Sequence, residues 1–259
     1  MYPQSAADWL YHSIKARDIF ADPAEGLGET LADAYAIQDA LIARMETDDG
    51  PIAGWKVALT SPVMQQMCGV DHPCEGAVLR ERVQRSPAVC DTSKLGRLGV
   101  EAEIALVIGQ DMPSDGEPYT SESAASCVSA AHAAIELVDD RNADYATITA
   151  AKLIANNSLN AGIILGPAVH DWRGLDLAAL KGAMLIDGKT VAEGTGADIL
   201  GHPLNALVWL ANSLTARGRM LRAGDIVMCG SFVRTQFPAA GQTVTCRVTG
   251  LGDAAVDVR

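Results

Sequence analysis

The sequence predicts an α+β protein that is rich in β-strands and begins with a helical segment. Three observations support this prediction: helical periodicity dominates the first fifty residues, short apolar runs between turns fill most of the rest, and these runs far outnumber the connecting helices. A doubly wound α/β sheet, which needs a helix between successive strands, does not fit. The 259 residues contain no long linker, so we expect a single domain over 1–259.

Residues 1–50 form the predicted helical segment. After Thr30, apolar side chains recur at intervals of three and four residues, which places them on one face of a helix. Thr30 is suited to cap this helix, with Asp33 reaching back to the cap. The turn-forming residues at 48–51 then end the helical pattern.

Residues 51–259 are expected to form the β-rich core. Its strand-type runs combine apolar or β-branched residues with turn residues on either side. The sequence Asp187-Gly188 is a strong signal for a hairpin turn between two of them. Two helices interrupt the strands, over about residues 120–131 and 203–218. The predicted strands are 54–59, 100–108, 133–138, 161–165, 183–186, 190–192, 225–229, 243–248 and 254–258.

The composition limits the partners and the location of the protein. Asp and Glu outnumber Lys and Arg by 32 to 20, and the net charge of −12 argues against nucleic acid or an anionic membrane as the main partner. The N-terminus lacks the apolar run of a signal peptide, and no segment is apolar for long enough to span a membrane. Six scattered cysteines without a C-x-x-C pair are typical of reduced thiols. We therefore expect a cytoplasmic protein without a nucleic-acid or membrane partner.

Glu101 and Glu103 lie in an otherwise apolar strand at 100–108. Residues two apart in a strand face the same side, so the two carboxylates are neighbours. If the strand is buried on both faces, they repel each other and lose hydration, and they either take up protons or hold a cation. The alternative is that both are solvated residues at the rim of an edge strand.

A third glutamate, Glu136, stands in the middle of another apolar strand at 133–138. Taken alone, it could form a salt bridge with Arg141. Taken together with Glu101 and Glu103, it is better explained by one hard divalent cation. A site made only of carboxylates favours Mg²⁺ or Mn²⁺ over zinc or copper. The three glutamates are therefore the predicted metal ligands.

Lys56 lies in the apolar strand 54–59, where a lysine either extends to the surface or lines a polar pocket. In a pocket it could hold a carboxylate or take part in proton transfer. Asn157 and Ser158 belong to a polar run before a strand, and Ser231 follows another strand. These polar residues either form turns or bind a substrate.

Taken together, these segments resemble the fumarylacetoacetate hydrolase superfamily. More narrowly, they resemble its 2-keto-4-pentenoate hydratase branch, which also contains 2-oxo-3-hexenedioate decarboxylases. The similarity extends in order over nearly the whole chain, which makes it more specific than any single motif. The matching pieces are residues 54–57, 59–61, 100–107, 136–139, 157, 160–162, 200–203, 209–212, 223–225 and 230–231.

The resemblance implies a mixed β-sandwich or roll of the family's C-terminal type, homo-oligomeric assembly, and Mg²⁺ or Mn²⁺ held by three carboxylates. Those carboxylates map onto Glu101, Glu103 and Glu136, and the family lysine maps onto Lys56. It further implies a cytoplasmic lyase of aromatic hydrocarbon catabolism that acts on a small anionic 2-oxo or 2-hydroxy acid. A complex with a partner enzyme of the same pathway belongs to the same expectation.

Two departures from the branch affect the acid–base groups around the metal. The branch usually has Pro-Asp-aromatic-Gly where this chain has Pro-Cys-Glu-Gly at 73–76. Cys74 thus replaces the acid, and Glu75 is the candidate substitute. A shift of one residue in an extended segment turns a side chain to the other face, which weakens Glu75 as a catalytic replacement. The branch also often has an aspartate where this chain has Asn156.

The leading hypothesis is hydration of a 2-hydroxy-2,4-dienoate to a 4-hydroxy-2-oxo acid, with water adding at C4. The metal would chelate the C1 carboxylate and the C2 oxygen as a Lewis acid, while Lys56 and the polar residues named above would position groups and move protons. The alternative hypothesis uses the same metal site to decarboxylate a 2-oxo-3-enedioate. A third is a non-catalytic or substrate-divergent member of the family, motivated by Cys74 and Asn156.

Overall fold

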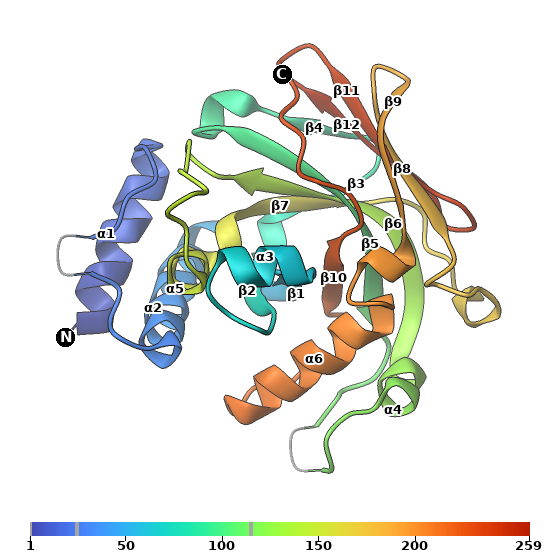
Figure 1. Cartoon of the computed structure of the whole chain (residues 1–259), viewed down its shortest axis with the longest axis horizontal. Coiled ribbons are helices and arrows are strands. Elements are labelled where there is room, and N and C mark those ends of the chain that lie inside the picture. Colours follow the sequence, from blue (N-terminus) through green and yellow to red (C-terminus); the bar gives the residue numbers. More distant parts are fainter. Residues whose placement is uncertain (1, 24–25, 114–115) are drawn as a thin grey trace.

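The computed structural model describes residues 2–23, 26–113 and 116–259, and in this part of the chain two mixed β-sheets pack against each other (Figure 1). The strand order is β2-β1-β10-β5-β6-β7-β3 in the larger sheet and β4-β12-β11-β8-β9 in the smaller one. This architecture confirms the predicted α+β class and the mixed roll. The strands of the larger sheet are β1 (Ile52–Ala58), β2 (Cys74–Leu79), β3 (Val83–Arg85), β5 (Leu98–Ile108), β6 (Val128–Asp139), β7 (Asn160–Leu165) and β10 (Ile226–Ser231). Those of the smaller sheet are β4 (Ala88–Cys90), β8 (Lys181–Ile186), β9 (Lys189–Thr195), β11 (Thr243–Val248) and β12 (Gly252–Val258).

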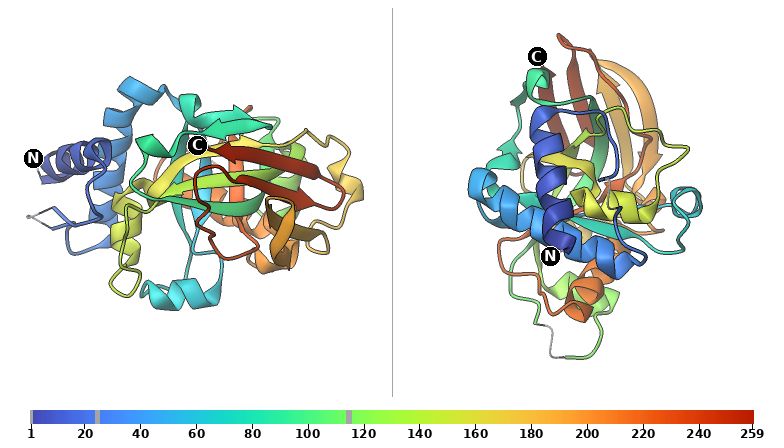
Figure 2. Two further views of the ribbon diagram at one scale, coloured as in Figure 1. Left: turned by 90° about the horizontal axis from the view of Figure 1, so that it is seen from above. Right: turned by 90° about the vertical axis from the view of Figure 1, so that its left-hand side faces the viewer.

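The helical N-terminal segment lies at one side of the molecule, where α1 (Tyr2–Ala16) and α2 (Leu31–Asp49) pack against each other (Figures 1 and 2). The Thr30 hydroxyl accepts a hydrogen bond from the Asp33 amide, and the Asp33 carboxylate accepts one from the Thr30 amide. The predicted cap is therefore confirmed. The remaining helices are α3 (Pro62–Met67), α4 (Ser121–Ser126), α5 (Ala150–Ala155) and α6 (Pro203–Ala216).

The predicted strands are found with their ends shifted by a few residues, and residues 187–188 join β8 to β9 as a hairpin. One prediction is wrong in its second half: the helix expected over about 120–131 ends at Ser126, and β6 begins at Val128. Residues 128–131 pair with β5 instead, because the ladder overrides the local helical preference of the alanines. The sequence patterns also do not reveal α3, α5, β2, β3 and β4, which are too short for periodicity to be read.

The larger sheet curls so that its two edge strands approach each other. β2 and β3 stand at opposite ends of the strand order, yet only one short 3₁₀ turn, Arg80–Arg82, separates them in sequence. The open side of β2 is closed by Asn157. Its Oδ1 accepts a hydrogen bond from the Ala77 amide at 2.7 Å, and its Nδ2 donates to the Ala77 carbonyl oxygen at 2.8 Å. One side-chain amide thus takes the place of a neighbouring strand.

The two faces of the larger sheet have different surroundings. One face packs on the smaller sheet, and the other lies inside the roll (Figure 2). The interior face carries an apolar cluster made of Val78, Ala105, Ala134, Ile163, Leu165, Ile226 and Met228. Side chains alternate along a strand, so Glu103 and Glu136, each two positions from a cluster residue, face the same interior. Lys56 also faces it, because it pairs directly with Met228.

Two sequence-based expectations concern the environment of the protein. All six cysteines are free and buried, as expected for reduced thiols. Among the residues that the structure describes, no helix combines the length and the apolar character that a membrane span requires.

Candidate metal centre and active site

The three predicted metal ligands come together inside the roll. Glu101 on β5 is the direct cross-strand partner of Glu136 on β6, and Glu103 lies two residues further along β5 on the same face. One carboxylate oxygen from each residue lies within 4.8 Å of the others. Glu103 and Glu136 are fully buried, whereas Glu101 is partly exposed. Two adjacent apolar strands thus gather three carboxylates at one point.

The buried carboxylates are only partly supplied with hydrogen-bond donors. The Gly230 amide donates to Glu103 Oε2, and Asn160 Nδ2 donates to Glu136 Oε1, both at 2.8 Å. Gly230 has φ +112°, and a Cβ there would lie 2.5 Å from the Thr60 side chain, so this donor position requires glycine. In the described structure Glu103 Oε1 accepts no hydrogen bond, and Glu136 Oε2 has only the ion pair with Lys56 at 3.2 Å. Oxygens of this kind are costly to bury unless a proton or cation meets them, so the donor set fits a hard divalent cation.

Lys56 supplies the positive charge beside this cluster. Its Nζ lies 3.2 Å from Glu136 Oε2 and donates a hydrogen bond to the Ser158 carbonyl oxygen at 3.4 Å. Burial by itself would lower the pKa of the ammonium, but the charges of Glu136, Glu101 and Glu103 outweigh it and raise that pKa above its usual range. Lys56 is therefore a protonated donor in the metal-free protein.

The pKa values of the two buried carboxylates are raised as well, which favours their neutral forms. Burial, followed by repulsion from Glu136 and Glu101, raises the pKa of Glu103 well above its usual value. Burial also raises the pKa of Glu136, although the charge of Lys56 opposes this shift. The metal-free cluster thus takes up protons more readily than free carboxylates, and a bound cation would compete with those protons.

These raised pKa values predict that the metal-free protein loses stability at this site as the pH rises. The unfolded chain releases the protons near the ordinary carboxyl pKa of about 4.3, whereas the folded protein releases them at higher pH. The folded state holds more protons in that window, so its free energy of unfolding falls with rising pH. Urea unfolding in EDTA at about pH 5 and about pH 7 measures the effect. Wild type should lose more stability over this interval than Glu103→Gln, and parallel losses would contradict the prediction.

Cys74 and Glu75 lie on opposite faces of β2. Cys74 pairs with Ala58 and Glu75 with Val57, so Cys74 shares the interior face with Lys56 and Glu75 points outward. The Cys74 thiol lies 3.8 Å from Ser158 Oγ. Burial raises its pKa to about 12, so it stays protonated. The chain thus has a neutral thiol on the face of Lys56.

Glu75 forms part of a buried polar network outside the roll. The Tyr35 hydroxyl donates to Glu75 Oε2 at 2.6 Å, and the Arg217 guanidinium pairs with the same carboxylate. Arg217 also pairs with Asp39 on α2 at 2.8 Å. Glu75 thereby ties β2 to α2 and to the end of α6. Its position does not support the catalytic role considered from the sequence, and we assign it a structural one.

Replacing Glu75 by glutamine is expected to lower the free energy of unfolding by about 3 kcal/mol, because it leaves the Arg217 guanidinium without its buried counter-charge. Turnover per folded molecule should change little. Urea unfolding combined with steady-state kinetics tests both parts. The matched control is Glu193→Gln on the exposed strand β9, which should alter neither. A large loss of kcat with unchanged stability would restore the catalytic interpretation.

The three predicted substrate-binding residues are tied to the backbone. Asn157 closes the sheet edge as described above, and Ser158 Oγ donates to the Glu75 carbonyl oxygen at 3.1 Å. Ser231 Oγ lies 2.7 Å from the Val233 carbonyl oxygen and 3.1 Å from that of Ala102. Residues 157–159 all adopt left-handed φ values, between +48° and +60°. Such strained backbone persists only where neighbours hold it, and here it directs the Ser158 carbonyl at Lys56.

The structure adds two side chains that the sequence analysis did not propose as site residues. Asn160 donates to Glu136, and the Thr235 hydroxyl donates to Glu101 Oε1 at 2.5 Å. Asn160 ends the polar run 156–160 and is the first residue of β7. Its place in that run could have marked it as a site residue. Thr235 lies in a loop more than a hundred residues from Glu101, and no local pattern connects them.

Comparison with known proteins places the chain in a family. The sequence pattern of the fumarylacetoacetate (FAA) hydrolase C-terminal family matches residues 77–259. The chain belongs to this family. The resemblance predicted from the sequence is thereby confirmed, and the carboxylates, Asn160 and Thr235 all lie within the matched residues.

Within the fumarylacetoacetate hydrolase family, the chain is similar to proteins of two named activities. It is 33% identical over 256 residues to a 2-keto-4-pentenoate hydratase of Paraburkholderia xenovorans, with 96% of this chain and 92% of the relative covered. It is 31% identical over 239 residues to a 4-oxalocrotonate decarboxylase of Pseudomonas putida, with 92% and 89% covered. The solved 4-oxalocrotonate decarboxylase of Pseudomonas putida G7, complexed with magnesium and adipate, superposes with a TM-score of 0.92 at 26% identity, over 100% of this chain and 97% of that one.

Proposed function

We propose that the protein is a divalent-cation-dependent hydratase that converts a 2-hydroxy-2,4-dienoate into a 4-hydroxy-2-oxo acid. The observation that carries this proposal is the interior trio of Glu101, Glu103 and Glu136 beside Lys56, in which Glu103 Oε1 meets no donor in the described structure. The hydratase relatives, at 33–36% identity over most of the chain, support the reaction type. The solved relative with bound magnesium supports Mg²⁺, and Mn²⁺ suits the same oxygen ligands.

The three glutamates would hold the cation, and a bound cation supplies Lewis acidity and charge neutralisation for the C1 carboxylate and C2 oxygen of the substrate. Lys56 is placed to deliver a proton as the dienol ketonises, because its ammonium is protonated and fixed in the interior. The Ser158 carbonyl orients the ammonium by accepting one of its protons. The apolar cluster of the roll limits the entry of bulk water around these groups.

The second candidate function is decarboxylation of a 2-oxo-3-enedioate at the same site, which the similarity to 4-oxalocrotonate decarboxylase supports. A dicarboxylate substrate needs a cation for its second carboxylate. In the described part of the chain, Lys56 is the one lysine or arginine that forms an ion pair with the cluster. We place the hydratase first because the hydratase relatives reach 36% identity, against 31% for the decarboxylase.

Activity assays of the full chain with two substrates distinguish the hydratase from the decarboxylase. We expect loss of the dienol absorbance of 2-hydroxypenta-2,4-dienoate with Mg²⁺ or Mn²⁺ and none in EDTA. Faster release of CO₂ from 2-oxo-3-hexenedioate would instead select the decarboxylase. Tight binding of Mn²⁺ without turnover of either acid would select a non-catalytic or substrate-divergent protein.

Three further expectations accompany the proposed function. A catabolic enzyme of this kind would act in the cytoplasm on a small organic acid, form a homo-oligomer, and associate with the enzyme before or after it in the pathway. Light scattering of the purified chain tests the oligomer. Co-purification of a partner from cells growing on aromatic compounds tests the pathway complex.

A further inference from the structure

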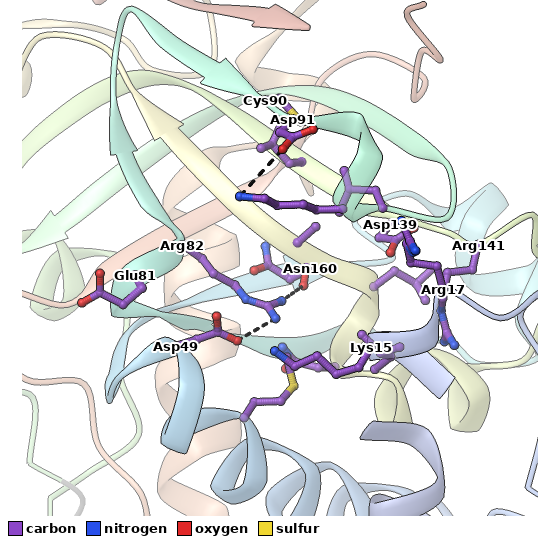
Figure 3. A pocket seen from close by; sticks show the side chains of 18 of the residues that line it. Lys15, Arg17, Asp49, Glu81, Arg82, Cys90, Asp91, Asp139, Arg141 and Asn160 are labelled. Atoms are coloured by element: carbon purple, nitrogen blue, oxygen red, sulfur yellow. Dashed lines mark hydrogen bonds and ion pairs between the residues drawn. The ribbon is translucent and has the colours of Figure 1, made fainter. Parts of the chain in front are cut away.

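A cleft of about 620 Å³ lies between the N-terminal helices and β7, outside the roll (Figure 3). Its floor includes Leu137 and Asp139 of β6, which alternate with Glu136 and therefore point away from the metal centre. Glu101, Glu103 and Lys56 are not among the residues that line it. The cleft does border Asn157 and Asn160, and Asn160 donates to Glu136, so it adjoins the proposed active site without containing its carboxylates or its lysine.

Arg141 lines this cleft and is only 2% exposed. Its guanidinium donates to Asn156 Oδ1 at 2.6 Å and to Ser13 Oγ at 3.1 Å, and both of these acceptors are uncharged. It also packs over the ring of Phe20, at 5.3 Å from the ring centroid. In the described part of the chain, no carboxylate lies within ion-pair distance of it. A buried cation without a counter-ion is costly, and burial accordingly lowers the pKa of Arg141.

The nearest carboxylates do not neutralise Arg141. Asp139 and Asp18 are close enough to act on its charge but form no ion pair with it. Asp139 Oδ1 instead accepts hydrogen bonds from the Gly96 and Arg97 amides, at 2.9 and 3.1 Å. Arg141 therefore has no direct counter-ion in the described structure, and Asp139 and Asp18 offset its charge only without contact.

Apart from Arg17, the other cations along the cleft each have a carboxylate partner, although Asp48, the partner of Lys15, lies outside the lining. Figure 3 shows Arg82 bonded to Asp49. Among the cations, Lys94 lies 3.8 Å from Asp91, and Lys15 pairs with Asp48. Glu81, which forms no ion pair with a described residue, stands at the opposite end of the cleft from Arg141 (Figure 3).

Arg17 adds a second guanidinium that forms no ion pair with a carboxylate among the described residues. It lies at the same end of the cleft as Arg141 (Figure 3), and it donates to the Ser93 carbonyl oxygen. Two guanidinium groups that meet only uncharged acceptors, beside a cavity large enough for a small molecule, form a receptor for an anion with planar or tetrahedral oxygens.

We propose that this cleft binds a small oxyanion, a carboxylate or a phosphate, at Arg141 and Arg17. The anion would be the direct counter-ion of Arg141, because the Asn156 side chain gives the guanidinium only an uncharged oxygen. A carboxylate at position 156 would fill that role from within the chain. Asn156→Asp is therefore the decisive variant, since it changes one charge with almost no change in shape.

The experiment measures the melting temperature of the full chain in rising sodium phosphate and, separately, sodium acetate, with sodium chloride at matched ionic strength as reference. Wild type should gain about 5 °C over chloride at an anion concentration a hundredfold above Kd. The anion that acts at lower concentration identifies the ligand class. Asn156→Asp should melt higher than wild type in chloride and lose the anion response.

Two further variants keep the test decisive. Gln66→Glu makes the same charge change on the exposed face of α3, away from the cleft, and should respond like wild type. Arg17→Gln alters an exposed side chain and should weaken the response at least fivefold in concentration, even if Asn156→Asp does not fold. An absent response in wild type, or an unchanged response in both cleft variants, would overturn the proposal.

Discussion

Replacing Glu103 by glutamine is expected to lower kcat by about a thousandfold or more, which corresponds to a loss of about 4 kcal/mol of transition-state stabilisation. The residue is fully buried, and its Oε1 has no other partner in the described structure. A glutamine keeps the shape but removes the charge that a cation requires. Steady-state kinetics with Mg²⁺ and a Mn²⁺ binding isotherm should both show the loss.

The stability of the same variant distinguishes a lost ligand from a lost fold. Without metal, Glu103→Gln should be at least as stable as wild type, because it removes repulsion from Glu136 and Glu101. With Mg²⁺ present, wild type alone should gain stability. Glu193→Gln on the exposed face of β9 serves as the control. Full metal binding by Glu103→Gln would contradict the assigned ligand set.

Replacing Lys56 by methionine is expected to reduce kcat by about a hundredfold to ten-thousandfold, because the proposed proton donor is lost while the aliphatic stem is kept. Metal binding should persist, since the three carboxylates remain. The metal-free variant should be less stable than wild type, because Glu136 then loses its only ion-pair partner in the described structure.

The matched control for Lys56 is Lys189→Met at the exposed start of β9, which should leave both kcat and stability unchanged. The pH profile adds an independent criterion. The pKa of Lys56 lies above its usual range, so the ammonium stays protonated in the assay, and the variant should keep the shape of the wild-type profile at a uniformly lower kcat. Equal loss of kcat and of Mn²⁺ affinity would instead show that Lys56 serves the metal and not the substrate.

Much of the metal centre follows from periodicity in the sequence. Alternation along a strand places Glu101 and Glu103 on one face, and apolar neighbours indicate that the strand is buried. The same logic selects Glu136 and Lys56 as unusual charges in apolar runs. The sequence does not reveal the pairing register between β5 and β6. That Glu101 lies opposite Glu136 depends on how two strands align, which no local pattern specifies.

Other parts of the site depend on contacts between distant segments. Asn157 is visible as a polar residue before a strand, but its bonds to Ala77 form only when the sheet curls. The outward direction of Glu75 follows from strand alternation, whereas its partners on α2 and α6 do not. The overlong helix at 120–131 has the same origin, because strand pairing over long distance outweighs local propensity.

The bond between Asn157 and Ala77 also affects how the molecule behaves at high concentration. An unpaired strand edge offers a row of amides and carbonyls to which a strand of another molecule can add, and such addition starts aggregation. At Ala77 both groups are already occupied by a side chain of the same molecule. The strand is thereby capped without the charged or proline residues that commonly protect edges. One asparagine thus leaves Ala77 without a free amide or carbonyl to offer to a strand of another molecule.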